Sequence, residues 1–210
     1  MKQVFKLGWI TFLLCTVLTI SSQAQSKDTV PVNPRTAMMQ KRASELIFPV
    51  IKGSVASGVF PISNPKSKID SNMDYKLLFD FTVGINAQYQ NGMINEGLDE
   101  IGRMINLHRA AGVSAKHLKV VIVTHSAAVL SLLNDAAYQA KFKINNPNAD
   151  IIKQLQSIGA TIVACGQTMQ FRDIKEEQLI DGVQKAFSAR TALSTYLSKG
   201  YVPFQIAEQH

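Results

Sequence analysis

The sequence predicts an α/β protein, a three-layer α/β/α sandwich around a mostly parallel sheet of about five strands. Two observations lead to this fold class. From Met73 onward, short apolar runs alternate with segments whose apolar residues recur at helical spacing. The run over residues 120–123 is also apolar without interruption, as in a strand that helices cover on both faces. Strands and helices that alternate in this way form βαβ units with right-handed crossovers.

The expected elements follow from local signals along the chain. Gly112, Gly159 and Gly200 each end a helical pattern, and Pro147 marks the first turn of a helix. Ser126 is a candidate N-cap for a helix that runs toward Phe142. The expected strands are 75–83, 119–124, 160–165, 183–187 and 201–206. The expected helices are 92–111, 126–142, 146–158 and 189–197, with a short helical or turn segment at 174–180.

The first 24 residues have the pattern of a signal peptide. Lys2 and Lys6 form a basic start, residues 7–20 are apolar, and Ser22-Gln23-Ala24 offers small residues at the positions that a signal peptidase reads. Cleavage after Ala24 would leave 210 − 24 = 186 residues. An uncleaved anchor is the alternative, although the apolar run is short for a membrane span. We therefore expect an exported protein, most simply periplasmic, with no stable membrane insertion after cleavage.

Residues 25–72 are expected to form an N-terminal extension that is partly flexible. Pro31 and Pro34 lie in a polar leader, residues 37–48 could form a short helix that Pro49 ends, and residues 53–72 favour irregular structure or a short hairpin. The compact domain is then expected over residues 73–210.

Composition and motifs exclude several classes of function. The formal net charge is +7, but the Lys and Arg residues form no stripe interleaved with aromatic residues, so nucleic-acid binding is not expected. The chain contains no Gly-rich phosphate loop and no serine nucleophile elbow. The histidines have no metal-ligand spacing. We expect no cofactor and no metal.

Cys165 is the main candidate for chemistry. Cleavage of the signal peptide would remove Cys15, so Cys165 would be a lone thiol without a partner for a disulfide or a C-x-x-C pair. It ends an apolar strand and precedes Gly166-Gln167, which places it at the carboxyl edge of the sheet, where open α/β sheets bind ligands. Cys165 is therefore either a nucleophile or sulfur carrier, or a small buried hydrophobic residue.

Other candidates lie at the same predicted edge. His125 follows the second strand and would raise the thiolate fraction of Cys165 if it came within hydrogen-bonding reach. The alternative for His125 is a helix-entry residue bonded to the backbone. The exposed N–H groups of a helix that begins after Gly166 would also stabilise a thiolate. The remaining candidates for a pocket are Gly166, Gln167, Asn86 and Arg190.

The chain from about Met73 to Ile206 resembles the DsrE/DsrF-like family of sulfur-relay proteins. The segments that carry the resemblance are VVIVTH at 120–125, LLNDAAY at 132–138, NPN at 146–148, ACGQT at 164–168 and the ending GYVPF at 200–204. The resemblance implies a small α/β/α domain that assembles into homo-oligomers, often trimers or hexamers. In the relay members of the family, a cysteine accepts sulfur as a persulfide and passes it on. Cys165 matches the strand-end cysteine of the secreted and YchN-like branches of the family.

Two main functions stay open at this point. The first is an exported protein that handles sulfane sulfur, with Cys165 as the persulfide carrier. The second is a non-catalytic oligomeric module that binds a ligand or partner and in which Cys165 is structural. A third, an envelope scaffold, would act through residues 25–72.

Overall fold

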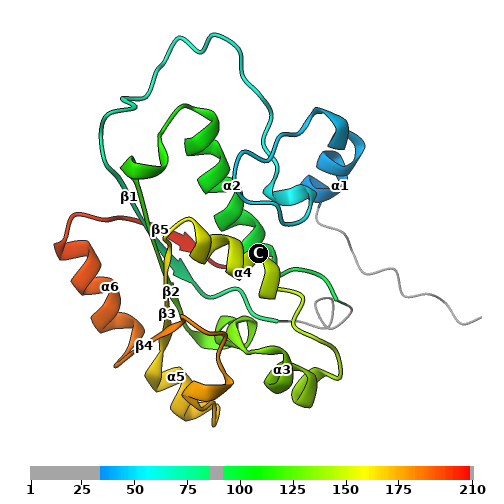
Figure 1. The fold of residues 1–210 in the computed structure, drawn as a ribbon, viewed down its shortest axis with the longest axis vertical. Coiled ribbons are helices and arrows are strands. Elements are labelled where there is room, and N and C mark those ends of the chain that lie inside the picture. The colour runs from blue at the N-terminus through cyan, green and yellow to red at the C-terminus, as the bar shows by residue number, and fades with distance from the viewer. Residues whose placement is uncertain (1–33, 86–91, 209–210) are drawn as a thin grey trace, which may run out of the picture. The chain divides into compact units, whose positions relative to one another are not determined.

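In the computed structural model, residues 34–85 and 92–208 are described, and they contain the expected α/β fold. A five-stranded sheet has the order β4-β3-β2-β1-β5, and every neighbouring pair is parallel (Figure 1). The prediction of a mostly parallel sheet of about five strands is thus confirmed. The strands are β1 (Tyr75–Phe81), β2 (Leu118–Thr124), β3 (Thr161–Cys165), β4 (Gln184–Ala186) and β5 (Val202–Ile206).

Helices connect the strands and flank the sheet. Figure 1 shows α6 on one side of the sheet and α2 and α4 on the other. None of the helices in the described ranges is long and apolar enough to cross a membrane. The α-helices are α1 (Pro34–Lys41), α2 (Glu96–Ala110), α3 (Asp135–Phe142), α4 (Ala149–Ser157), α5 (Gly166–Phe171) and α6 (Ala189–Ser198). The 3₁₀ segments are η1 (Ala43–Glu45), η2 (Val55–Ser57), η4 (Ala115–His117), η5 (Ser126–Leu132) and η6 (Glu176–Gln178).

The continuous helix expected over residues 126–142 is replaced by two elements, η5 and α3. Ser126 does not cap a helix, because its own backbone is left-handed, with φ at 56°. The segment from Ser126 to Leu132 forms 3₁₀ turns, and Leu133 then returns to an extended conformation. Asn134 caps α3 instead, since its side chain accepts a hydrogen bond from the N–H of Ala137 at 2.9 Å.

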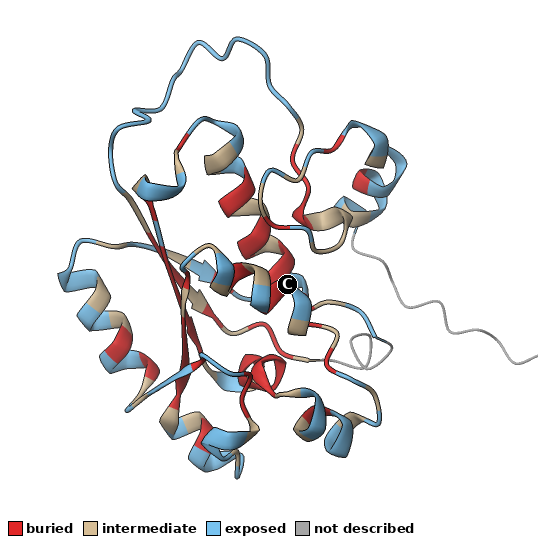
Figure 2. Cartoon of the chain, viewed as in Figure 1, coloured by how far each residue is buried: buried red, intermediate tan, exposed pale blue. Residues whose placement is uncertain are grey.

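The two faces of the sheet are covered unequally. Side chains alternate along a strand, so Phe79 and Phe81 of β1 point toward α2 while Leu78 points toward α6. The face toward α2, α4 and η5 holds most of the buried apolar residues, and Figure 2 shows the inner side of α2 as buried. The α6 face holds a thinner cluster, made of Leu78, Val121, Val123, Val163, Cys165, Ala189 and Ala192.

Part of the segment before β1 packs against α2 and belongs to the same compact unit as the sheet. The Ile51 side chain is fully buried in the main core. The buried amide of Asn106 accepts hydrogen bonds from the N–H groups of Val50 and Ile51, at 3.0 and 2.9 Å. The same amide donates to the carbonyls of Ile51 and Ser57, at 2.7 and 2.9 Å. One side chain on α2 therefore fixes the path of this segment.

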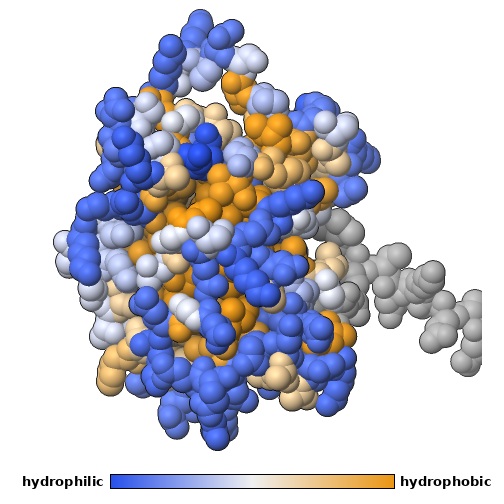
Figure 3. Space-filling model, in the orientation of Figure 1, coloured by the Kyte–Doolittle hydropathy of each residue, from blue (hydrophilic) through white to orange (hydrophobic). Residues whose placement is uncertain are grey.

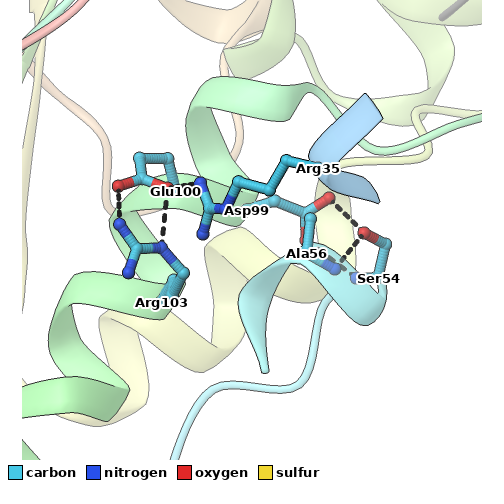
Figure 4. A network of polar contacts seen from close by, with 6 residues as sticks. All are labelled: Arg35, Ser54, Ala56, Asp99, Glu100 and Arg103. Atoms are coloured by element: carbon cyan, nitrogen blue, oxygen red, sulfur yellow. Dashed lines mark hydrogen bonds and ion pairs between the residues drawn. The ribbon is translucent and has the colours of Figure 1, made fainter. Parts of the chain in front are cut away.

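A second attachment of this segment runs through Asp99 of α2 (Figure 4). The Asp99 carboxylate accepts a hydrogen bond from the N–H of Ser54 at 2.8 Å and one from its hydroxyl at 2.6 Å. Arg35 reaches the neighbouring Glu100, with 2.8 Å between Nη1 and Oε2. Burial raises the pKa of Asp99 to about 6, and the hydrogen bonds from Ser54 oppose that rise without cancelling it.

The raised pKa of Asp99 makes stability depend on pH. The pKa in the folded state, about 6, lies above the ordinary value of 3.8, so the stability linked to this carboxyl is present below about pH 4 and is lost as the pH rises through 6. Asp99→Asn keeps a neutral side chain of the same shape. We expect this variant to be more stable than the wild type at pH 8, by up to about 3 kcal/mol, and to lose the part of the pH dependence that Asp99 causes.

Urea unfolding at pH 4, 6 and 8 would measure this difference, with the exposed Asp181→Asn as the matched control. A wild type and an Asp99→Asn variant that respond identically to pH would contradict the assignment.

Candidate functional site

Cys165 lies at the carboxyl end of β3, directly before the first residue of α5. Its side chain points to the α6 face and is 5% exposed. It is the one cysteine among the described residues, and it is unpaired. The structure therefore has the Cys165 thiol at the carboxyl edge of the sheet, where the sequence predicts it.

Several hydrogen-bond donors converge on the Cys165 sulfur. The N–H of Ala189 donates to Sγ at 3.2 Å, and Ala189 is the first residue of α6. Further hydrogen bonds come from the hydroxyl and N–H of Thr168 and from the N–H of Gln167. Burial alone raises the pKa of the Cys165 thiol, but these hydrogen bonds together outweigh burial and lower the pKa below its ordinary value. The starts of α5 and α6 thus both face the sulfur and favour its thiolate.

Gly166 and Gln167 hold the β4–α6 connection beside the thiol. A Cβ atom on Gly166 would lie 2.6 Å from the carbonyl oxygen of Ala186, so only glycine allows the ends of β3 and β4 to approach this closely. The amide of Gln167 donates to the carbonyl of Phe187 at 3.4 Å. Ala189 follows two residues later, so these contacts bring its N–H to the sulfur.

The imidazole of His125 is paired with Asp80. His125 Nε2 lies 2.8 Å from Asp80 Oδ1, and Nδ1 lies 3.2 Å from the Ser126 hydroxyl. The backbone N–H of His125 donates to the carbonyl of Phe81 at 3.1 Å and extends the ladder between β1 and β2. None of the hydrogen bonds to the Cys165 sulfur comes from His125. His125 and Cys165 each follow the paired residues Thr124 and Ala164, so they are neighbours across the strand ends.

Two residues of the site were missed in the sequence. Asp80 lies within a buried strand between Phe79 and Phe81, and an acidic residue in such a run is the signal that could have found it. Thr168 donates to the Cys165 sulfur and accepts a hydrogen bond from the N–H of Ser126 at 3.3 Å. The sequence feature that could have identified Thr168 is a hydroxyl residue in the first helical turn after Cys165.

Among the described residues, no contact brings Arg190 to the sulfur. Arg190 is the second residue of α6 and is exposed, and its guanidinium makes no hydrogen bond or ion pair with any residue in the described ranges. Asn86 lies outside the described residues. Among residues 34–85 and 92–208, no three His, Cys, Asp or Glu side chains form a group that could hold a metal ion.

Removing the Thr168 hydroxyl tests the origin of the lowered thiol pKa. Thr168→Val keeps the size of the side chain but deletes its hydrogen bond to the sulfur, so the pKa of Cys165 should rise. Alkylation by iodoacetamide at neutral pH should slow several-fold, and its pH profile should move to higher pH. Thr195→Val, on the exposed side of α6, is the control and should leave the profile unchanged. An unaltered profile in Thr168→Val would show that this hydrogen bond does not set the pKa.

Comparison with known proteins places this chain in a family. The model of the DsrE/DsrF-like family matches residues 90–205, more than half of the 210-residue chain. Among solved structures, the chain is similar to one titled "Structure of Protein of Unknown Function MTH1491 from Methanobacterium thermoautotrophicum", with a TM-score of 0.45 and 17% identity. That match covers 63% of this chain and 99% of the other. No curated protein matches. The family match extends from before α2 into β5 and includes Cys165, and on this ground the chain belongs to the DsrE/DsrF-like family.

Proposed function

We propose that this protein is a sulfur-relay protein in which Cys165 carries sulfane sulfur as a persulfide. Membership of the DsrE/DsrF-like family supports the sulfur-relay class. The observation that carries the proposal is the set of donors around the sulfur, from Thr168, Gln167 and Ala189, which lowers the pKa of the thiol. Since the thiolate is the nucleophilic form of cysteine, these donors prepare Cys165 for attack on sulfur.

The proposed reaction is an exchange between persulfides. The Cys165 thiolate attacks the outer sulfur of a donor persulfide, R–S–SH. A new sulfur–sulfur bond forms to Sγ, the sulfur–sulfur bond of the donor breaks, and the inner sulfur leaves as a thiolate that takes up a proton. Transfer to an acceptor thiolate reverses these steps. The donor supplies the sulfane sulfur already oxidised, so no further oxidant is needed.

A protein donor or acceptor fits the surroundings of the thiol. Phe187 lies in the β4–α6 connection and is 78% exposed, and Phe171 ends α5 and is 87% exposed. Both aromatic residues belong to segments that border Cys165. Exposed aromatic side chains are typical of protein interfaces, so we propose that a partner protein docks over these segments to reach the sulfur.

A second candidate is a non-catalytic oligomeric module that binds a ligand or partner. The observation that favours it is the burial of Cys165, which is 5% exposed and lies in the apolar cluster under α6. Free cysteine commonly packs in this way as a small hydrophobic residue. In this case the thiol would react only after unfolding.

Homo-oligomerisation, as a trimer or hexamer, and export to the periplasm remain predictions. Figure 3 shows hydrophobic surface at the centre of the face that carries α2 and α4, and an exposed apolar patch is a common interface between subunits. A monomer in native mass spectrometry at micromolar concentration would count against assembly. Residues 1–24 lie outside the described residues. N-terminal sequencing of the mature protein should begin at or near Gln25, and an intact Met1 would overturn export.

Incubation with a persulfide donor tests the main proposal. We expect the native wild type to gain one sulfur atom by mass, and Cys165→Ser to gain none. The Ser variant should unfold at a similar temperature, because serine is close in size and can accept the N–H of Ala189. If instead the native thiol is unreactive and Cys165→Ser mainly lowers stability, the binding module replaces the sulfur-relay proposal.

A further inference from the structure

A pair of titratable side chains, Asp80 and His125, lies near the thiol but does not bind it. Asp80 is on β1 and His125 directly follows β2, and Cys165 ends β3. Leu78, Val123 and Val163 lie two residues before Asp80, His125 and Cys165 respectively, and they pack on the α6 face. Because side chains alternate along a strand, the side chains of Asp80, His125 and Cys165 also lie on the α6 face. The strands that carry or precede them, β1, β2 and β3, are neighbours in the sheet.

The pair is open to solvent, whereas the thiol is buried. The side chains of His125 and Asp80 are 27% and 28% exposed. A small donor molecule that reaches the strand ends can therefore contact the imidazole. Cys165 already receives hydrogen bonds from Thr168, Gln167 and Ala189, so its thiolate does not depend on His125.

Asp80 controls how the imidazole is held. The 2.8 Å contact makes Nε2–H of His125 a donor to the carboxylate, which fixes the orientation of the ring. Nδ1 then lies 3.2 Å from the exposed Ser126 hydroxyl and provides the nitrogen through which a proton can enter or leave. A carboxylate that orients an imidazole in this way is the arrangement used for general acid–base catalysis.

Resting on the proposed function, we propose that the Asp80–His125 pair is the proton donor to the thiolate that leaves when Cys165 accepts sulfur. His125 is the catalytic residue and Asp80 the positioning residue. The substrate class is persulfides of alkyl thiols, such as a cysteine persulfide. Their leaving thiolates are basic, since free cysteine has a pKa of about 8.5, so protonation assists their departure.

The proton and electron pairs balance in this step. The Cys165 thiolate attacks the outer sulfur of R–S–SH, and the electron pair of the breaking bond goes to the inner sulfur. The imidazolium of His125 gives its proton to that sulfur, so that R–SH leaves and neutral imidazole remains beside Asp80. The imidazole then takes the proton of the new Cys165 persulfide, and the pair returns to its starting state.

The chain contains a matched control for this pair. His117 Nδ1 lies 2.7 Å from Asp74 Oδ1, and these residues directly precede β2 and β1. This second His–Asp pair is thus at the amino ends of the same two strands, at the opposite edge of the sheet from Cys165. The variants His125→Gln, Asp80→Asn and Asp80→Glu can be compared with His117→Gln.

Two small electrophiles distinguish the loss of a proton donor from a change in the reactivity of the Cys165 thiol. The first is 2-hydroxyethyl persulfide, whose leaving group is a basic alkyl thiolate. The second is methyl methanethiosulfonate, whose leaving group is a sulfinate that needs no proton. Rates at Cys165 are measured by mass spectrometry in single turnovers. The rate with methyl methanethiosulfonate also reports whether the fold around the thiol is intact in each variant.

We expect His125→Gln to slow transfer from the persulfide by about 100-fold and to leave the rate with methyl methanethiosulfonate unchanged. Asp80→Asn should slow only the persulfide reaction, Asp80→Glu should restore it in part, and His117→Gln should change neither. An equal loss with both reagents, or no loss with either, would overturn the proton-donor role. A wild type that reacts with methyl methanethiosulfonate but takes no sulfur from the persulfide would overturn the proposed function itself.

Discussion

The contact between the end of β3 and the start of α6 organises the candidate site. The N–H of Ala189 reaches the Cys165 sulfur only because the β4–α6 connection lies directly against Gly166. A side chain at position 166 would collide with the carbonyl of Ala186 and push that connection away. The same approach aligns the first turn of α6 with the thiol, so a steric property of one glycine sets the electrostatic environment of the sulfur.

The two faces of the sheet are covered unequally, and this allows buried and solvent-exposed groups to lie side by side at the site. The face toward α2 and α4 carries the larger cluster of buried apolar residues, whereas α6 covers the other face with a smaller cluster. Charged and polar groups at the strand ends of a doubly covered sheet would be costly to bury. On the α6 face, Asp80 and His125 retain contact with water while Cys165, one strand further, is enclosed. A buried thiol and a solvent-accessible imidazole therefore lie at the ends of neighbouring strands.

Much of the fold could be predicted from the sequence because its signals are local. The strands follow from apolar runs such as 120–123, and glycines such as Gly112 mark where helices stop. The break between η5 and α3 could not be predicted, because the left-handed conformation of Ser126 depends on tertiary contacts, including its N–H bond to Thr168. The position of Cys165 at the sheet edge followed from the strand pattern. The contact between Asp80 and His125 depends on the pairing of strands that lie far apart in the chain, which no local pattern contains.

The packing of Ile51 and Asn106 has a consequence for where the folding unit begins. The family match starts at residue 90, after β1, yet β1 lies between β2 and β5 in the sheet. A fragment cut at that boundary would lose a central strand and leave two strand edges without partners. It would also lose Ile51, whose full burial contributes about 2 kcal/mol, and would leave the buried amide of Asn106 without its backbone partners. The shortest fragment that folds as this protein does must therefore reach back to the residues before Ile51.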